Sequence, residues 1–108
     1  MSREIRIPKH RVPTGPGEIL EEEFRKELGL TQEQFANALG IDRPTYNMIV
    51  KGRRRITPDM AMRLSIVLGV SPQTWLNLQM SVDLYQAKQS ARMTMLRKEL
   101  KPLVRIRA

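Results

Sequence analysis

The stretch from Thr31 to Gly52 constrains the fold of this chain most, because helix start and stop signals follow one another closely within it. Thr31 and Gln34 form a T-x-x-Q capping box, which predicts a helix over residues 32–39. Gly40 ends that helix, since glycine readily takes the positive φ that lets a chain reverse. The pattern predicts a short helix followed at once by a tight turn.

A second helix is predicted directly after this turn, over residues 43–50. Asp42 supplies a cap through its carboxylate, and Pro44 in the first turn loses no needed hydrogen bond. The apolar residues of both helices recur at helical spacing and predict one inward face: Phe35, Ala36, Leu39, Tyr46, Ile49 and Val50. Two short helices joined in this way form a helix-turn-helix.

The outward positions of the second helix carry side chains suited to reading DNA bases. Arg43 can bond guanine through two hydrogen bonds, Asn47 can bond adenine in the same way, and Thr45 can offer its hydroxyl or methyl group. A basic turn follows, in which Lys51, Arg53 and Arg54, together with Arg55, lie where phosphates flank a helix in the major groove. The pattern predicts base contacts from the helix and phosphate contacts from the turn. A generic helical hairpin is the competing interpretation.

Composition agrees with a polyanionic partner. The 108 residues suit one domain with one core, and the net charge is +8. Five cations and no acid lie between Arg43 and Arg55, whereas the acids gather between Glu18 and Glu27. Three of these acids are the consecutive Glu21, Glu22 and Glu23. Consecutive glutamates fan out around a helix, so we expect a solvated face away from the DNA.

The same composition argues against catalysis. The chain has no cysteine and a single histidine, His10, and lacks a glycine-rich phosphate loop and metal-ligand spacing. We expect no enzyme activity, no metal site and no cofactor. No apolar run approaches the roughly 20 residues of a membrane span, and the N-terminus has no hydrophobic signal core. A cytoplasmic protein without a membrane partner is expected.

Three further helices are predicted. One opens at Pro16 and stops at Gly29, one covers residues 58–68, and one begins at Pro72. The expected inward residues of these helices are Ile19, Leu20, Phe24, Leu28, Met60, Ala61, Leu64, Val67, Leu68, Trp75, Leu76, Leu78 and Leu84. Trp75 lies in an apolar run, so we expect it to anchor the core. The fold class is all-α, a compact five-helix domain with a C-terminal helical or extended extension.

The two ends of the chain differ from this middle part. Residues 1–14 form a basic arm, residues 15–84 the helix-turn-helix domain, and residues 85–108 a basic extension. Helical spacing in the extension predicts that the last helix continues to Glu99, and the alternation over residues 103–107 is typical of a strand. The extension also carries more apolar side chains than a solvated tail needs, so we expect it to pack on another protein surface.

Four blocks carry a resemblance to a known family: PGEILEEEF, LTQEQFANALGIDRPTYNMIVKGRRRIT, PDMAMRLSIVLGVSP and WLNLQMSVDL. They span residues 16–84. On these blocks the chain resembles the Cro/C1-type (XRE) helix-turn-helix family, and within it the HigA-type antitoxins, also labelled virulence-associated protein I. The WLNLQ block is the more specific marker, because the helix-turn-helix alone occurs in many repressors.

The resemblance implies a lambda-repressor-like fold and a dimeric repressor that binds double-stranded operator DNA. It also implies neutralisation of a HigB-type toxin, a ribosome-dependent mRNA nuclease. By the family pattern, Gln32 contacts phosphate, and Arg43, Thr45 and Asn47 face the groove. The chain departs from the pattern at Pro44, where relatives often carry a polar side chain, so no operator sequence is implied. A stand-alone regulator without a toxin is the alternative.

Overall fold

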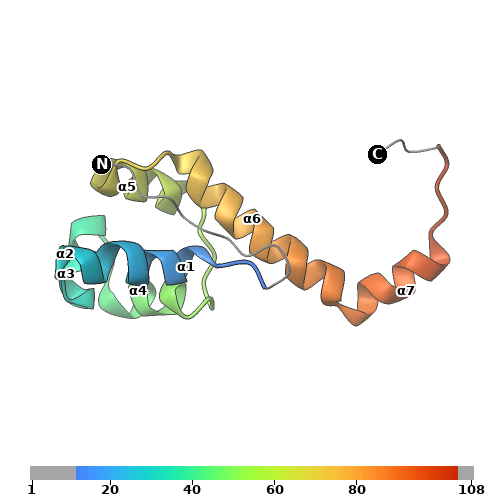
Figure 1. Cartoon of the computed structure of the whole chain (residues 1–108), viewed down its shortest axis with the longest axis horizontal. Helices are drawn as coiled ribbons and strands as arrows, with labels where there is room; N and C mark the ends of the chain where they lie inside the picture. Colours follow the sequence, from blue (N-terminus) through green and yellow to red (C-terminus); the bar gives the residue numbers. More distant parts are fainter. Residues whose placement is uncertain (1–11, 105–108) are drawn as a thin grey trace.

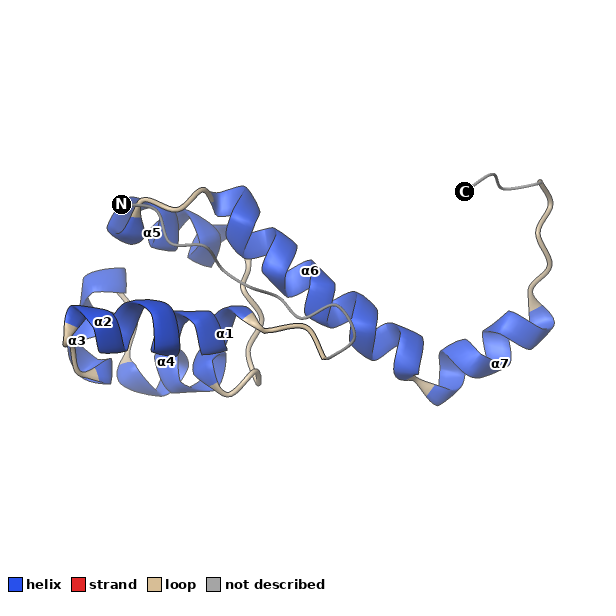
Figure 2. Cartoon of the chain, in the orientation of Figure 1, coloured by secondary structure: helices blue, strands red, loops and turns tan. Residues whose placement is uncertain are grey.

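The computed structural model describes residues 12–104, and this part of the chain consists of helices joined by turns and loops, without a strand (Figure 2). In chain order the elements are α1 Pro16–Ile19, the π-helix η1 Leu20–Arg25, α2 Lys26–Leu28, α3 Gln32–Leu39, α4 Arg43–Val50, α5 Pro58–Leu68, α6 Pro72–Gln89 and α7 Ala91–Glu99. The first five helical segments and α5 pack with the start of α6. The rest of α6 projects from this body and carries α7 at its far end (Figure 1). The all-helical prediction is confirmed.

The predicted first helix is one continuous rod made of α1, η1 and α2. Pro16 occupies its first position, and Gly29 ends it in the left-handed conformation at φ 69°. Both ends agree with the prediction. The wider π turn in the middle had no sequence signal. Such turns are rare and often lie at functional positions.

The helices of the motif have the predicted bounds, 32–39 and 43–50. The Thr31 hydroxyl accepts a hydrogen bond from the Gln34 amide at 3.0 Å, and Gln34 Oε1 accepts one from the Thr31 amide at 2.9 Å. Gly40 ends α3 at φ 73°. The capping box and the glycine stop are therefore both formed as predicted.

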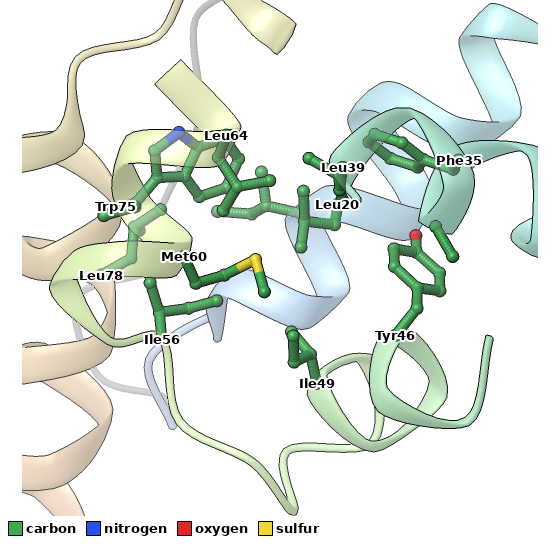
Figure 3. Close-up of a cluster of buried hydrophobic side chains, with 13 residues drawn as sticks. Leu20, Phe35, Leu39, Tyr46, Ile49, Ile56, Met60, Leu64, Trp75 and Leu78 are labelled. Atoms are coloured by element: carbon green, nitrogen blue, oxygen red, sulfur yellow. The ribbon is translucent and has the colours of Figure 1, made fainter. Parts of the chain in front are cut away.

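One hydrophobic core joins the helical segments other than α2 and α7 (Figure 3). Its buried members are Ile19, Leu20, Phe35, Ala36, Leu39, Tyr46, Ile49, Ile56, Met60, Ala61, Leu64, Trp75 and Leu78. Trp75 is 1% exposed and its ring centroid lies 5.7 Å from that of Phe24, which confirms its role as a core anchor. The prediction was wrong for Leu28, Val67 and Leu84, which are exposed. They keep the helical spacing, but no second element covers their positions.

The helix α1 lies against α4 at Gly17, a contact that the sequence did not reveal. A Cβ atom at this position would lie 2.2 Å from the carbonyl oxygen of Ile49 and 2.7 Å from the Cα of Val50. Both are backbone atoms, which cannot rotate away. Only glycine permits this approach, so Gly17 fixes how deeply α4 sits on the core.

The last predicted helix does not continue unbroken to Glu99. Ser90 takes an extended conformation at ψ 146° and separates α6 from α7. Its hydroxyl accepts a hydrogen bond from the Met93 amide at 3.1 Å, so it caps α7 and favours a new helix over continuation. Leu103 and Val104 form a bend, and residues 105–107 of the strand-like segment lie outside the described residues. Most of the arm over residues 1–14 also lies outside them.

Candidate nucleic-acid interface

The helix α4 presents the three predicted base-reading side chains beside a buried inner face. Tyr46 and Ile49 are buried in the core, whereas Arg43 is exposed and Thr45 and Asn47 are half-buried. The inner residues hold the helix, and the outer residues stay accessible to a groove.

Asp42 fixes the start of α4. Its Oδ1 accepts a hydrogen bond from the Thr45 amide at 2.8 Å. Hydrogen bonds from Thr45, followed by the positive charge of Arg54, hold the pKa of the Asp42 carboxyl below its ordinary value. The first turn of α4 and the basic turn beyond its last turn therefore influence each other electrostatically.

The basic turn folds back on the end of α4. The amides of Arg53 and Arg54 both donate to the carbonyl oxygen of Met48, at 2.9 and 3.2 Å, and Gly52 takes a φ of 72°. The side chains of Lys51, Arg53 and Arg54 are exposed and form no ion pair with any residue between 12 and 104. No described carboxylate holds them in an ion pair, so they can contact phosphates.

Arg55 behaves differently from the other three cations of the turn. It forms an ion pair with Asp83 of α6. Asp83 also accepts a hydrogen bond from Gln79 at 3.1 Å, and the buried Gln79 accepts one from the Ile56 amide at 2.8 Å. This chain of contacts, which sequence reasoning missed, ties the end of the basic turn to α6. Gln79 gave no clear sequence signal, because Gln73, Thr74 and Asn77 precede it in α6.

One acid lies at the motif rather than away from it, which corrects the expected solvated acidic face. Glu21 is 7% exposed. Its Oε1 accepts a hydrogen bond from Gln32 Nε2 at 2.9 Å, and its Oε2 accepts one from Arg25 Nε at 2.6 Å. Gln32 Oε1 in turn accepts from Asn47 Nδ2 at 3.3 Å. The structure thus brings Gln32 and Asn47 together and joins both to Glu21; we call Arg25, Glu21, Gln32 and Asn47 the amide relay.

The charge state of Glu21 follows from these partners. Burial acts to raise the pKa of its carboxyl, but hydrogen bonds from Arg25 and Gln32 and the charge of Arg25 lower it below 4.5 overall. Burial and the nearby Glu21 carboxylate raise the pKa of the Tyr46 hydroxyl, which stays neutral. Glu21 is therefore an ionised acceptor at neutral pH.

A pH dependence of stability follows from the lowered pKa of Glu21. A carboxyl with a lowered folded-state pKa stabilises the fold above its unfolded-state pKa, and this contribution is lost as the pH falls through the folded-state value. We expect the free energy of unfolding to fall more steeply below about pH 4.5 in the native chain than in Glu21→Gln. Urea unfolding over a series of pH values measures this. The exposed Glu22→Gln variant is the control and retains the native pH dependence; equal slopes for all three proteins would contradict the expectation.

Neither a metal site nor a membrane-spanning helix is found between residues 12 and 104. No group of three or more His, Cys, Asp or Glu side chains there is placed to hold a metal ion. No helix in this range has both the length and the hydropathy needed to cross a bilayer.

Comparison with known proteins places this geometry in a family. The family model described as Helix-turn-helix (HTH_3) matches residues 22–75, which include α3, α4 and α5. This chain belongs to the HTH_3 helix-turn-helix family. Among its relatives, virulence-associated protein I of Dichelobacter nodosus is 45% identical over 74 residues, 68% of each chain. Antitoxin HigA-1 of Vibrio cholerae is 36% identical over 78 residues, 72% of this chain and 73% of that protein.

Solved structures of this helix-turn-helix family include complexes with DNA. The chain is similar to the Pseudomonas aeruginosa antitoxin HigA solved with the higBA promoter, with a TM-score of 0.78 and 39% identity over 85% of this chain and 99% of that one. It is also similar to antitoxin GraA in complex with its operator, with a TM-score of 0.78 and 41% identity over 93% of this chain and 100% of that one. The resemblance to XRE-type chains, HigA antitoxins and virulence-associated protein I is confirmed.

Proposed function

We propose that this chain is a sequence-specific DNA-binding antitoxin of a type II toxin-antitoxin system that represses its own operon as a homodimer. The observation that carries the proposal is the surface of α4, where accessible Arg43, Thr45 and Asn47 lie next to unpaired cations of the basic turn. Similarity to a HigA solved with its promoter and to GraA solved with its operator supports it. In this proposal residues 15–84 are the DNA-binding domain, residues 1–14 an arm and residues 85–108 an extension, in a cytoplasmic protein without enzymatic activity.

In the proposed complex α4 lies in the major groove of double-stranded DNA. Arg43, Thr45 and Asn47 contact base edges, while Lys51, Arg53 and Arg54 contact phosphates beside the groove. Gln32 at the start of α3 contacts a further phosphate with its second amide hydrogen, since the first is donated to Glu21. Arg55 is withdrawn from this set by its ion pair with Asp83.

The base contacts are tested by replacing them singly. Arg43→Ala and Asn47→Ala should each lose roughly 1 to 3 kcal/mol of operator binding and relax the preference at particular base pairs, because those contacts carry sequence information. Competition binding with operators substituted one base pair at a time measures this. Exposed Met48→Ala, on the same helix, is a matched control with no base-specific hydrogen bond to lose. An unchanged preference in Asn47→Ala would contradict the proposed register of α4.

A dimer is proposed because one helix of this length reads too few bases. Two copies of α4 related by a twofold axis would reach half-sites about 34 Å apart, which is one turn of DNA. The operator should therefore be a palindrome. The exposed apolar residues beyond the core supply surface for a second protein: Leu84, Met95, Leu100, Leu103 and Val104.

Removal of residues 92–108 tests the role of this extension. We expect loss of dimerisation or of toxin neutralisation. The deletion removes the exposed Met95, Leu100, Leu103 and Val104, and burying even half of these four side chains would contribute roughly 1.5 to 3 kcal/mol for each one buried. Light scattering measures the first property, and a growth assay with the co-expressed HigB-type mRNA nuclease measures the second. The core contains no residue of α7, so far-ultraviolet circular dichroism should show an intact fold. Normal dimerisation and normal neutralisation together would overturn this proposal.

A stand-alone regulator without a toxin is the second candidate. It is favoured by the relatives described only as HTH-type transcriptional regulators, one of which, from Haemophilus influenzae, is 39% identical over 85% of this chain. Co-expression with the adjacent reading frame, followed by a pull-down, separates the two. A co-purified small basic protein supports the antitoxin, and operator binding without any such partner supports the regulator.

A further inference from the structure

At the inner end of the amide relay, each of two groups can hydrogen-bond in only one sense. Arg25 is a guanidinium, which can only donate, and the ionised Glu21 can only accept. One oxygen of Glu21 accepts a hydrogen bond from Arg25 at 2.6 Å, and the other accepts one from Gln32 at 2.9 Å. Gln32 must therefore turn its NH2 group toward Glu21, which leaves its carbonyl oxygen facing Asn47.

The orientation of the Gln32 amide in turn determines the orientation of the Asn47 amide. Because Gln32 offers an oxygen, Asn47 must turn its Nδ2 toward α3, as the 3.3 Å contact between them shows. The order of donor and acceptor along the outer edge of the Asn47 amide is then fixed. Adenine is recognised by an amide that accepts from N6 and donates to N7 at defined places, so this order decides which base fits.

We propose that Glu21, a residue that need not touch DNA, is a specificity-determining positioning residue: its carboxylate sets, through Gln32, which edge Asn47 presents to a base. This inference rests on the proposed function. Glu21 and Asn47 are 26 residues apart and belong to different helices, which explains why the link is invisible in the sequence.

Glu21→Gln provides the sharpest test, because it keeps the shape of the side chain. The new amide has one oxygen, and Arg25 requires it, so its NH2 group must face Gln32. Gln32 and Asn47 then both turn over with every hydrogen bond retained. We expect discrimination at the base pair read by Asn47 to fall by about fivefold or more, or to switch to another base, while binding to nonspecific DNA stays unchanged.

Glu22→Gln is the matched control. It removes the same charge one residue away, at an exposed side chain whose partner is Lys26 at 2.8 Å. Its operator preference should equal that of the native chain. Thermal unfolding of all three proteins checks that Glu21→Gln is folded.

A readout that does not involve DNA separates failure of the inference from failure of the proposed function. The side-chain amide resonances of Gln32 and Asn47 in the free protein should shift in Glu21→Gln and stay in place in Glu22→Gln. Unmoved resonances would overturn the role proposed for Glu21 but not the proposed function. A native base preference in Glu21→Gln, together with its loss in Asn47→Ala, would do the same. If the resonances shift but Asn47→Ala keeps the native preference, the base contact proposed for Asn47 is wrong and the specificity role of Glu21 falls with it.

Discussion

Gly17→Ala is expected to destabilise the fold by about 3 kcal/mol or more, at the upper end of the range for overpacked sites. The added methyl group would lie 2.2 Å from the Ile49 carbonyl oxygen and 2.7 Å from the Val50 Cα. Backbone atoms cannot move aside as a side-chain tip can, so α1 and α4 must separate. Urea unfolding measures the loss of stability. Operator binding should fall as well, since α4 carries the proposed base contacts.

Gly15→Ala is the control for this change. It lies two residues earlier, and its new methyl group would meet only Val82 Cγ2, at an ordinary distance of 3.6 Å. Its φ of −79° suits any residue. Stability should stay near the native value. Equal losses in the two variants would mean that the close approach of α1 to α4 does not explain the result.

Arg53→Ala/Arg54→Ala is expected to weaken binding to all DNA sequences about equally. Each lost phosphate contact lowers the slope of log affinity against log salt by about 0.9, so the double variant should lose roughly two units. The affinity ratio between roughly 50 and 200 mM salt should then shrink by about tenfold. Fluorescence anisotropy with operator and scrambled duplexes over a salt series measures both slopes.

Arg92→Ala/Lys98→Ala removes the same charge from α7, away from the helix-turn-helix. If the basic turn contacts phosphate, this control keeps nearly the native slope. A slope reduced equally in both double variants would mean that net charge alone governs the salt dependence. A selective loss of operator binding in Arg53→Ala/Arg54→Ala would instead mean that one of these arginines reads a base.

Local sequence signals were sufficient to predict where most helices of this fold begin and end. The caps at Thr31, Asp42 and Thr57 and the glycine stops act within one helical turn, so the sequence alone predicted the bounds of α3 and α4. Helical spacing predicted the core residues correctly where a second element covers the apolar face of the helix. Val67 and Leu84 show the limit, since spacing places a residue on a face but does not say whether that face is covered.

The connections within the candidate site could not be predicted, because they join residues far apart in the chain. Glu21 reaches Gln32 and Arg55 reaches Asp83 only after the helices pack. A run of glutamates is usually solvated, and no local pattern marks the one that turns inward at a π turn. The site residues Gln32, Arg43, Thr45, Asn47, Lys51, Arg53 and Arg54 remain predictions until DNA binding is measured.

Arg63 of α5 hydrogen-bonds to the turn between α3 and α4, although it lies outside the helix-turn-helix. Its Nη1 donates to the carbonyl oxygens of Leu39 and Gly40, at 3.0 and 3.1 Å, while Asp59 holds its Nε at 2.8 Å. The last carbonyls of α3 therefore find their donor in a residue more than twenty positions away. Transplanting residues 31–52 into a foreign scaffold would carry the recognition side chains without this donor. The helix-turn-helix segment is thus not structurally self-sufficient, and a chimaera that contains it needs α5 as well.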